Sequence, residues 1–425
     1  MTKDDMDYKL FTKILEEELI PAIGCTEPIA LAYAAARARE ILGALPDKVV
    51  VQASGNIIKN VKSVIVPNTG NLKGIPAAVS AGIVAGDAGK KLEVVASITK
   101  DCFKQIKDYM DNTDISVECL ESDMTFDVII TEFHGNDVSK VRIANAHTNI
   151  VTEELNGEKL LNIPVKCESD EGMTDHSCLT GEKIWEYANN VNLDDVRHII
   201  KRQIDYNTAI AEEGIKGDYG ANIGKVILNS YGNDVHNRAK AMAAAGSDAR
   251  MNGCELPVVI NSGSGNQGIT CCLPVVEYAR ELKSDEDTLY RALVLSNMLA
   301  IHIKSGIGRL SAYCSAVSAG AAAGAGIAYL HGGDYKTILH TVVNALGIIS
   351  GTICDGAKAS CAAKIASSVD AGILGFDMYR GGKQFKSGDG IVAKGFEANV
   401  KNIGRLGKDG MKYTDTEILK MMLGE

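Results

Sequence analysis

A long run without a charged side chain, Leu310 to Leu330, constrains the fold of this chain most strongly. Its length approaches the roughly 20 apolar residues that span a bilayer. However, the run consists mainly of Ala, Gly and Ser, which gain little from entering lipid. It therefore predicts a helix buried inside a water-soluble protein rather than a membrane span. The 43 glycines against 8 prolines also favour close backbone packing and glycine-rich loops over stiff linkers.

The distribution of helical and β-branched segments predicts an α+β fold. Apolar positions at helical spacing run through residues 5–20, a capping residue and Pro28 in the first turn predict a helix over 26–39, and the small apolar residues 72–88 predict another. The chain is helical in pattern again from about 180 to the end. From about 91 to 165, β-branched runs such as Leu92–Ile98 alternate with turns, which is typical of strands. We therefore expect a mainly helical catalytic domain built from residues 1–90 and 176–425, with a smaller α+β domain inserted at 91–175.

Charge and cysteine content limit the classes of function. The net charge of −10 comes without a basic stripe interleaved with aromatic residues, so we expect no nucleic-acid partner. The N-terminus lacks an apolar stretch behind a basic start, so a signal peptide is not expected. Eleven cysteines, an odd number in a long chain, argue against a disulfide scaffold and favour the reducing cytoplasm.

Three cysteines in the last third of the chain are the candidate metal ligands: Cys314, Cys354 and Cys361. The last two are nearly two helical turns apart, which would put both on one face of a helix. Three thiolates without a local fourth suit an iron–sulfur cluster that leaves one iron open to a substrate. The spacing matches neither a ferredoxin run nor a zinc ribbon, and two thiols on a helix are often simply buried.

Cys25 is the candidate catalytic residue. It stands in Gly24-Cys25-Thr26-Glu27-Pro28, immediately before a predicted helix, where the helix dipole favours a thiolate. We expect a reactive thiol that acts as an acid or base, or as a labile ligand to the open iron. The alternative is a buried cap residue without a chemical role.

A glycine-rich stretch, Asn261 to Gly268, follows a strand-like segment and could hold an anion. Consecutive backbone N–H groups in such a stretch suit a phosphate or a carboxylate. The stretch has neither the Gly-Lys-Ser/Thr of a P-loop nor the flanking pattern of a dinucleotide site. A substrate carboxylate site and a tight structural turn remain equally open, and the candidate binding residues are Ser262, Gly263 and Asn266.

A polar cluster early in the chain is rich in amides and poor in carboxylates. Amide and ammonium donors suit the carboxylate of a zwitterionic amino acid, although a solvated loop would explain the same composition. The candidate substrate-binding residues here are Ser54, Asn56, Lys59, Asn60 and Asn68.

These motifs together resemble the L-cysteine desulfidase family, which is related to the α chain of iron–sulfur L-serine dehydratase. The resemblance covers essentially the whole chain and includes Gly24–Pro28, Ser54–Asn60, Asn261–Gly268 and the three candidate metal ligands. It implies a [4Fe–4S] enzyme that converts L-cysteine to pyruvate, ammonia and sulfide. Cys314, Cys354 and Cys361 would then hold three irons, and Cys25 would be the active-site cysteine, with its thiolate as a candidate base for the α-proton.

The resemblance leaves three functions open. The leading hypothesis is L-cysteine desulfidase, and the second is an L-serine or L-threonine dehydratase that uses the same cluster. The third is a cluster-free protein that binds an amino acid. In each case we expect a small amino acid as the ligand, a homodimer as the assembly, and no membrane partner.

Overall fold

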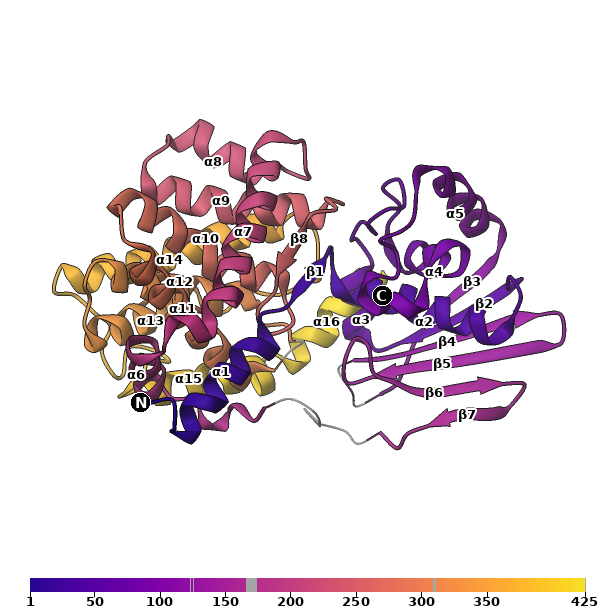
Figure 1. Ribbon diagram of the computed structural model, residues 1–425, viewed down its shortest axis with the longest axis horizontal. Helices are drawn as coiled ribbons and strands as arrows, with labels where there is room; N and C mark the ends of the chain where they lie inside the picture. The colour runs from indigo at the N-terminus through magenta and orange to yellow at the C-terminus, as the bar shows by residue number, and fades with distance from the viewer. Residues whose placement is uncertain (123, 125, 166–173, 309–310, 425) are drawn as a thin grey trace.

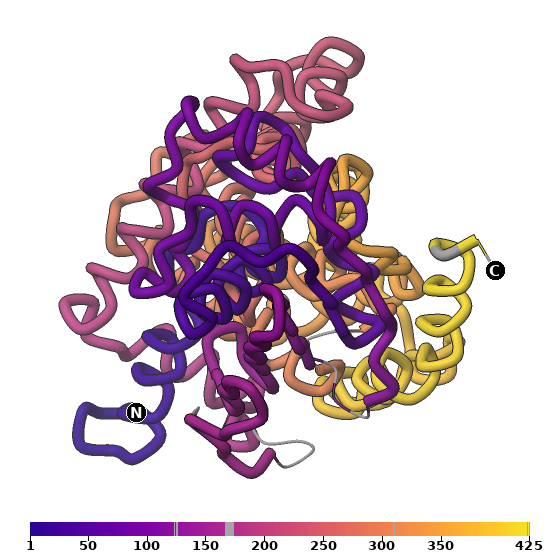
Figure 2. The backbone as a smooth tube through the Cα atoms, turned by 90° about the vertical axis from the view of Figure 1, so that its right-hand side faces the viewer, coloured from indigo at the N-terminus to yellow at the C-terminus, as the bar shows by residue number. Residues whose placement is uncertain are grey.

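The computed structural model describes residues 1–122, 124, 126–165, 174–308 and 311–424. These residues form a mainly helical unit and a smaller unit of helices on a mixed sheet, packed side by side (Figure 1). The α+β fold class expected from the sequence is therefore confirmed. In Figure 2 the sheet unit faces the viewer and the helical unit lies behind it.

The smaller unit contains a six-stranded sheet with the order β3-β2-β4-β5-β6-β7. Strands β2 and β3 run parallel, and all the other neighbouring pairs are antiparallel. The strands are β2 (Lys48–Ala53), β3 (Asp114–Cys119), β4 (Asp127–His134), β5 (Asp137–Ala144), β6 (Ile150–Leu155) and β7 (Glu158–Asn162). Buried and more exposed residues alternate along β2 and most of β5, because one face of the sheet packs on helices.

Helix α2 (Thr26–Leu42) covers the buried face of this sheet, and a second helix packs on α2. Helix α2 contacts β4 and β5, and the second helix is α4 (Gly74–Ala85). A Cβ atom at Gly82 would overlap the backbone of Ala32, so glycine is required where these two helices cross. The unit also contains α3 (Gly55–Val61), η1 (Ala88–Glu93) and α5 (Lys100–Asn112).

Several expectations for the first 120 residues were wrong in detail. Strand β2 lies inside the six-stranded sheet, so residues on both sides of the expected boundary at 91 share one sheet and one hydrophobic core. In sequence, that core begins at Cys25. Residues 25–90 belong to the sheet unit because β2 pairs with β3 and β4, although most of the segment around β2 is helical. The expected strand at Leu92–Ile98 is the end of η1 and the turn that follows it, and the polar segment after Ser54 is the short helix α3. Part of the expected 91–175 domain, residues 166–173, lies outside the described residues.

The helical unit is built around α12 (Ser315–Leu330), which is buried along almost its whole length as the uncharged run predicted. Leu310, the first residue of that run, lies outside the described residues. Gly320 and Gly324 of α12 face the backbone of α14 (Cys361–Arg380) at Ser368 and Gly372, where a Cβ atom would collide. Within the described part of the chain, no helix combines the length and the apolarity that a membrane crossing requires.

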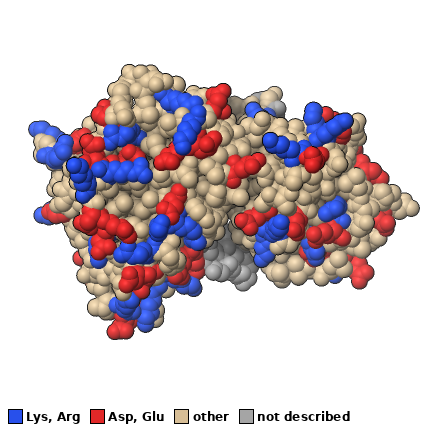
Figure 3. Space-filling view, turned by 45° about the horizontal axis from the view of Figure 1, so that its top comes forward, with Lys and Arg blue, Asp and Glu red and all other residues tan. Residues whose placement is uncertain are grey.

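The remaining elements surround this centre. They are α1 (Met6–Glu18), η2 (His176–Cys178), α6 (Gly181–Asn190), α7 (Leu193–Lys216), α8 (Ile223–Tyr231), α9 (Val235–Met251), α10 (Gly265–Leu282), α11 (Glu286–Ile307), α13 (Tyr335–Ile349), α15 (Phe396–Arg405), η3 (Leu406–Gly410) and α16 (Lys412–Leu423). On the molecular face in Figure 3, Lys and Arg side chains are intermixed with Asp and Glu over both units.

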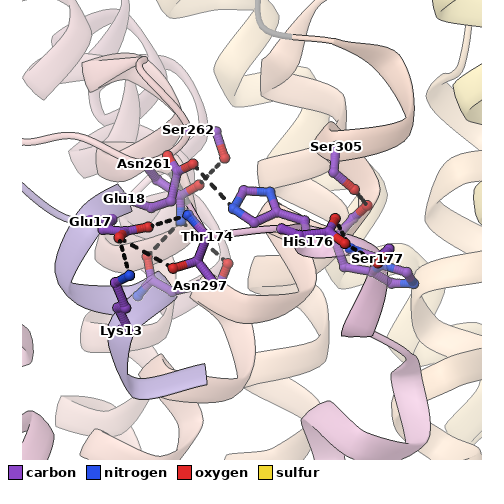
Figure 4. Close-up of polar contacts among 12 residues, drawn as sticks. Lys13, Glu17, Glu18, Thr174, His176, Ser177, Asn261, Ser262, Asn297 and Ser305 are labelled. Carbon is purple, nitrogen blue, oxygen red and sulfur yellow. Dashed lines mark hydrogen bonds and ion pairs between the residues drawn. The ribbon is translucent and has the colours of Figure 1, made fainter. Parts of the chain in front are cut away.

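The two ends of the chain tie the units together. Helix α1 belongs to the core of the helical unit, and β1 (Pro21–Ile23) leaves it by pairing with β8 (Pro257–Val259). The chain returns to the helical unit at Thr174, whose N–H and hydroxyl donate to Glu17 at the end of α1 (Figure 4). The last helix, α16, extends from the helical unit to α3 of the sheet unit (Figure 1).

Candidate active site

A cavity of about 430 Å³ lies between the two units and receives side chains from both. The predicted site residues that line it are Cys25, Lys59, Asn60, Ser262, Gly263, Asn266, Cys314, Cys354 and Cys361. Charged or titratable residues that were not among the predicted site residues also line it, including Glu27, His147 and Arg250. The structure therefore brings the candidate catalytic residue and the candidate metal ligands to one cavity.

Local backbone pairing brings the three distant cysteines together. Cys314 is the N-cap of α12, and Cys361 is the first residue of α14. Cys354 lies on the loop before α14, and an isolated antiparallel bridge joins this loop to the segment before α12. The Cys314 N–H donates to the Thr352 carbonyl at 3.0 Å, and the Cys354 N–H donates to the Ala312 carbonyl at 2.6 Å. The two cysteine segments are thus fixed side by side at the start of two packed helices.

The pKa values of the clustered cysteines are set by burial, by repulsion between their thiolates and by the positive charge of Lys364. Burial, followed by the proximity of Cys354, raises the pKa of Cys314 to about 12, and burial also raises the pKa of Cys361. Lys364 lowers both pKa values in part; it forms an ion pair with Asp355 and donates to the Ile353 carbonyl. Among the described residues, no three His, Cys, Asp or Glu side chains converge closely enough to ligate a single metal ion.

Gly356 allows the cysteine loop to contact the sheet unit directly. It has φ +91°, a conformation that side-chain-bearing residues rarely adopt. A Cβ atom there would also overlap the carbonyl oxygen of Lys59 in α3. Glycine is therefore needed both for the bend of the loop and for the close approach of the two cavity walls.

Cys25 forms a hydrogen-bonded pair with Glu27 on the opposite wall of the cavity. Its thiol, at the N-cap of α2, donates to Glu27 Oε2 at 2.9 Å, and Asn60 Nδ2 donates to Glu27 Oε1 at 3.2 Å. Burial and the Glu27 charge raise the pKa of Cys25 well above its usual value, although Arg250 opposes them. The helix start was expected to favour a thiolate, but in this structure desolvation and Glu27 outweigh the helix dipole.

Glu27 is the ionised partner of the pair. Burial alone would raise its pKa, but the His147 charge, the hydrogen bond from Cys25 and the Arg250 charge lower the pKa on balance. His147 follows β5, and its ring packs edge-on against Phe126 at 4.6 Å between centroids. Glu27 was part of the quoted Gly24–Pro28 motif, so the motif contained the signal for it. His147 and Arg250 stand in no comparable pattern.

The amide-rich cluster divides between the cavity and the interior. Lys59 and Asn60 line the cavity, but the Lys59 ammonium forms an ion pair with Asp415 of α16. Ser54, Asn56 and Asn68 do not line it. Ser54 is the buried N-cap of α3, and Asn68 donates to the Val95 carbonyl at 3.0 Å, so these two residues have structural roles in this structure.

The predicted glycine loop is a tight turn at the start of α10. Ser262 (φ +49°) and Gly263 (φ +77°) are both left-handed, and backbone hydrogen bonds run in both directions between Asn261 and Ser264. This is the geometry of a type I′ turn. The Ser264 hydroxyl then caps the helix by accepting from the Gln267 N–H at 3.3 Å. The turn and the carboxylate site were alternatives in the sequence, and the structure has the turn in the cavity wall.

A network of buried amide side chains anchors this turn to the helical unit. Asn261 Oδ1 accepts from the Ser262 hydroxyl at 2.9 Å and from Gln267 Nε2 at 2.7 Å, and its Nδ2 donates to Asn297 Oδ1 at 3.0 Å (Figure 4). Asn297 in turn exchanges two hydrogen bonds with Gln203 of α7. Buried networks of this kind fix one arrangement, because each lost bond leaves a desolvated polar group.

Comparison with known proteins gives one family. The family model described as "Serine dehydratase alpha chain" matches residues 89–420. Three similar relatives, each named only as a UPF0597 protein, come from Desulfitobacterium hafniense, Lachnoclostridium phytofermentans and Treponema denticola. They are 58%, 49% and 45% identical, over 100%, 98% and 100% of this chain and 99%, 100% and 100% of their own lengths. The chain belongs to the serine dehydratase alpha chain family.

Proposed function

We propose that this protein is an L-cysteine desulfidase, which uses a [4Fe–4S] cluster to convert L-cysteine and water to pyruvate, ammonia and hydrogen sulfide. The observation that carries the proposal is the convergence of Cys314, Cys354 and Cys361 with Cys25 on one cavity. Membership of the serine dehydratase alpha chain family supports lyase chemistry on a small amino acid.

The donor set fits a multi-iron cluster better than a single ion. Cys314, Cys354 and Cys361 supply thiolates, the ligands that iron–sulfur clusters require, and each would bind a different iron. When bound, the cluster would supply an open iron as a Lewis acid for the leaving sulfur.

The Cys25–Glu27 pair is suited to moving a proton. β-Elimination breaks the Cα–H bond and the Cβ–S bond of the substrate and leaves aminoacrylate, which hydrolyses to pyruvate and ammonia. Ionised Glu27 accepts a hydrogen bond from the Cys25 thiol and is the group in contact that can take its proton. The raised pKa of Cys25 makes this transfer uphill, but the thiolate that results would be a strong base for the α-proton. Asn60 holds the other Glu27 oxygen and orients the carboxylate.

L-Serine dehydratase is the second candidate, favoured by the description of the matching family. The same residues would serve it, because hydroxide and hydrosulfide differ only as leaving groups. A cluster-free amino-acid-binding protein remains the third candidate.

The test is anaerobic reconstitution with iron and sulfide, followed by a pyruvate assay on L-cysteine, L-serine and L-threonine. We expect broad visible absorbance and the fastest turnover with L-cysteine. Faster turnover of L-serine would replace the desulfidase with a dehydratase. Absence of both absorbance and turnover would leave the binding protein.

Matched cysteine variants give the control. Cys354→Ser should lose iron and activity, whereas Cys102→Ser in α5, outside the cavity, should retain both. Equal iron content in the two variants would contradict the cluster assignment.

A further inference from the structure

Arg250 is a buried cation in the cavity wall that forms no ion pair with an acidic side chain of the described residues, although its charge acts on Glu27 over a longer distance. It is only 4% exposed, at the end of α9, and lines the cavity. Its Nη1 donates to the neutral side chain of Asn266 at 3.1 Å, and its Nε has no hydrogen-bond partner among the described residues. No described acidic side chain lies within ion-pair distance of it. Burying a guanidinium without an ionic partner costs folding free energy, and a bound anion would offset this cost.

A second source of positive potential lies against the same guanidinium. Gly265 is the first residue of α10, and a Cβ atom there would collide with Arg250 Nε and Cζ. The guanidinium therefore lies directly over the N-terminus of an 18-residue helix. Helix N-termini favour anions through the dipole and unpaired N–H groups, and an arginine fork binds both oxygens of a carboxylate.

The charges of Glu27 and Lys59, which also line the cavity, are bound to other groups and do not neutralise the Arg250 guanidinium by direct contact. Glu27 accepts from Cys25 and Asn60, and Lys59 pairs with Asp415, so these charges already have partners. Asn266, expected to bind substrate, instead accepts from Arg250 and orients the guanidinium. The Arg250 guanidinium is thus a cavity-lining cation that forms no ion pair with a described acidic side chain.

We propose that Arg250 binds the α-carboxylate of the amino-acid substrate and makes the site specific for free amino acids over their amides and esters. This inference rests on the proposed function for the identity of the substrate. The carboxylate would receive the Arg250 fork on one side and the start of α10 on the other. A neutral carboxamide would place its NH₂ donor against the same donors and be rejected.

The first test is binding without turnover. L-Alanine has the carboxylate and the amine of the substrate but no leaving group, and L-alaninamide lacks only the carboxylate. We expect L-alanine to raise the melting temperature of the wild-type protein and L-alaninamide to leave it unchanged. Arg250→Gln should abolish the response to L-alanine. The matched control is Arg280→Gln on α10, a half-exposed arginine paired with Glu277 outside the cavity, which should respond as the wild type does.

The second test is the kinetics of the reconstituted enzyme. Arg250→Gln should raise KM for L-cysteine by about 10- to 100-fold, the range expected for hydrogen bonds to a charged group. Arg250→Lys keeps the charge but loses the fork, so it should fold like the wild type, bind more weakly and still reject L-cysteinamide.

Several results would overturn the proposal. They are an unchanged L-alanine response in Arg250→Gln, equal responses of the wild type to L-alanine and L-alaninamide, or no response of the wild type to L-alanine. The two tests also separate this inference from the proposed function. Binding that depends on Arg250 without pyruvate formation would refute the lyase alone, whereas turnover that is indifferent to Arg250 would refute the carboxylate site alone.

Discussion

Glu132 offers a quantitative test of the electrostatics inside the sheet unit. It lies in the interior strand β4, opposite Ser139 of β5, and is completely buried. Neither of its carboxylate oxygens has a hydrogen-bond partner among the described residues. Burial raises its pKa to about 9, and the opposing charge of Arg39 reduces the shift only in part. The folded protein should therefore hold this carboxyl protonated at neutral pH.

The sign of the effect on stability follows from proton binding. Between the ordinary glutamate pKa near 4.3 and about 9, the folded state binds a proton that the unfolded state has released. Stability is then fully present below the unfolded pKa and falls as the pH rises toward the folded pKa. Each pH unit costs about 1.4 kcal/mol, so the free energy of unfolding should fall by about 3 kcal/mol from pH 6 to pH 8 through this group alone.

Glu132→Gln should remove this dependence, because the amide keeps the shape of the side chain and does not titrate. The assay is urea unfolding followed by far-UV circular dichroism at pH 6 and pH 8, at constant ionic strength. The control is Glu158→Gln in β7, where the side chain is exposed. From pH 6 to pH 8, the free energy of unfolding of the wild type should fall by about 3 kcal/mol more than that of Glu132→Gln. The Glu158→Gln control should show the same fall as the wild type. Parallel behaviour of Glu132→Gln and the wild type would refute the reasoning.

Three further predictions concern the cavity. Asp415→Asn leaves the buried Lys59 ammonium without its ionic partner, so the free energy of unfolding measured in urea should fall by about 1–3 kcal/mol. The double variant with Lys59→Met should recover part of this stability. Purely additive effects of the two substitutions would contradict the coupling. Gly356→Ala should lower the iron bound per chain after reconstitution, because its Cβ meets Lys59 and its φ is positive; wild-type iron content would show that the loop adapts. Cys25 should react slowly with iodoacetamide at pH 7–8, and faster in Glu27→Gln, where one cause of its raised pKa is gone; the alkylated peptide quantified by mass spectrometry measures this, and equal rates would contradict the role of Glu27.

The sequence predicted best where one segment determines its own structure. Helix α12 was predicted because a run of Ala, Gly and Ser can be buried only against closely packed neighbours. Strands β4 and β5 were likewise visible as β-branched runs separated by a turn, within the region from about 91 to 165. The position of β2 was not, because its partners β3 and β4 come more than 60 residues later, and pairing over that distance leaves no local signal.

The candidate site followed the same division. Cys25 could be found because it directly precedes a predicted helix, and the three later cysteines because they form a set of candidate thiolate ligands in the last third of the chain. Arg250 looked like any surface arginine, since its burial depends on Gly265 from another helix. The role of Lys59 also could not be foreseen, because Asp415 arrives with the last helix of the chain.

The pairing of chain ends has a consequence for the order in which the protein is made. The last fully buried residue of the sheet core is Ile143 and the last strand of the sheet ends at Asn162, so most of this unit can fold while the ribosome is still translating. Helix α1 and β1, made first, must wait for β8 and for the helical core that follows it. The thiols cannot meet before Cys361 emerges, and Lys59 has no ionic partner before Asp415. Iron would therefore have to be delivered to a nearly complete chain, after the sheet unit that forms one wall of the cavity has folded.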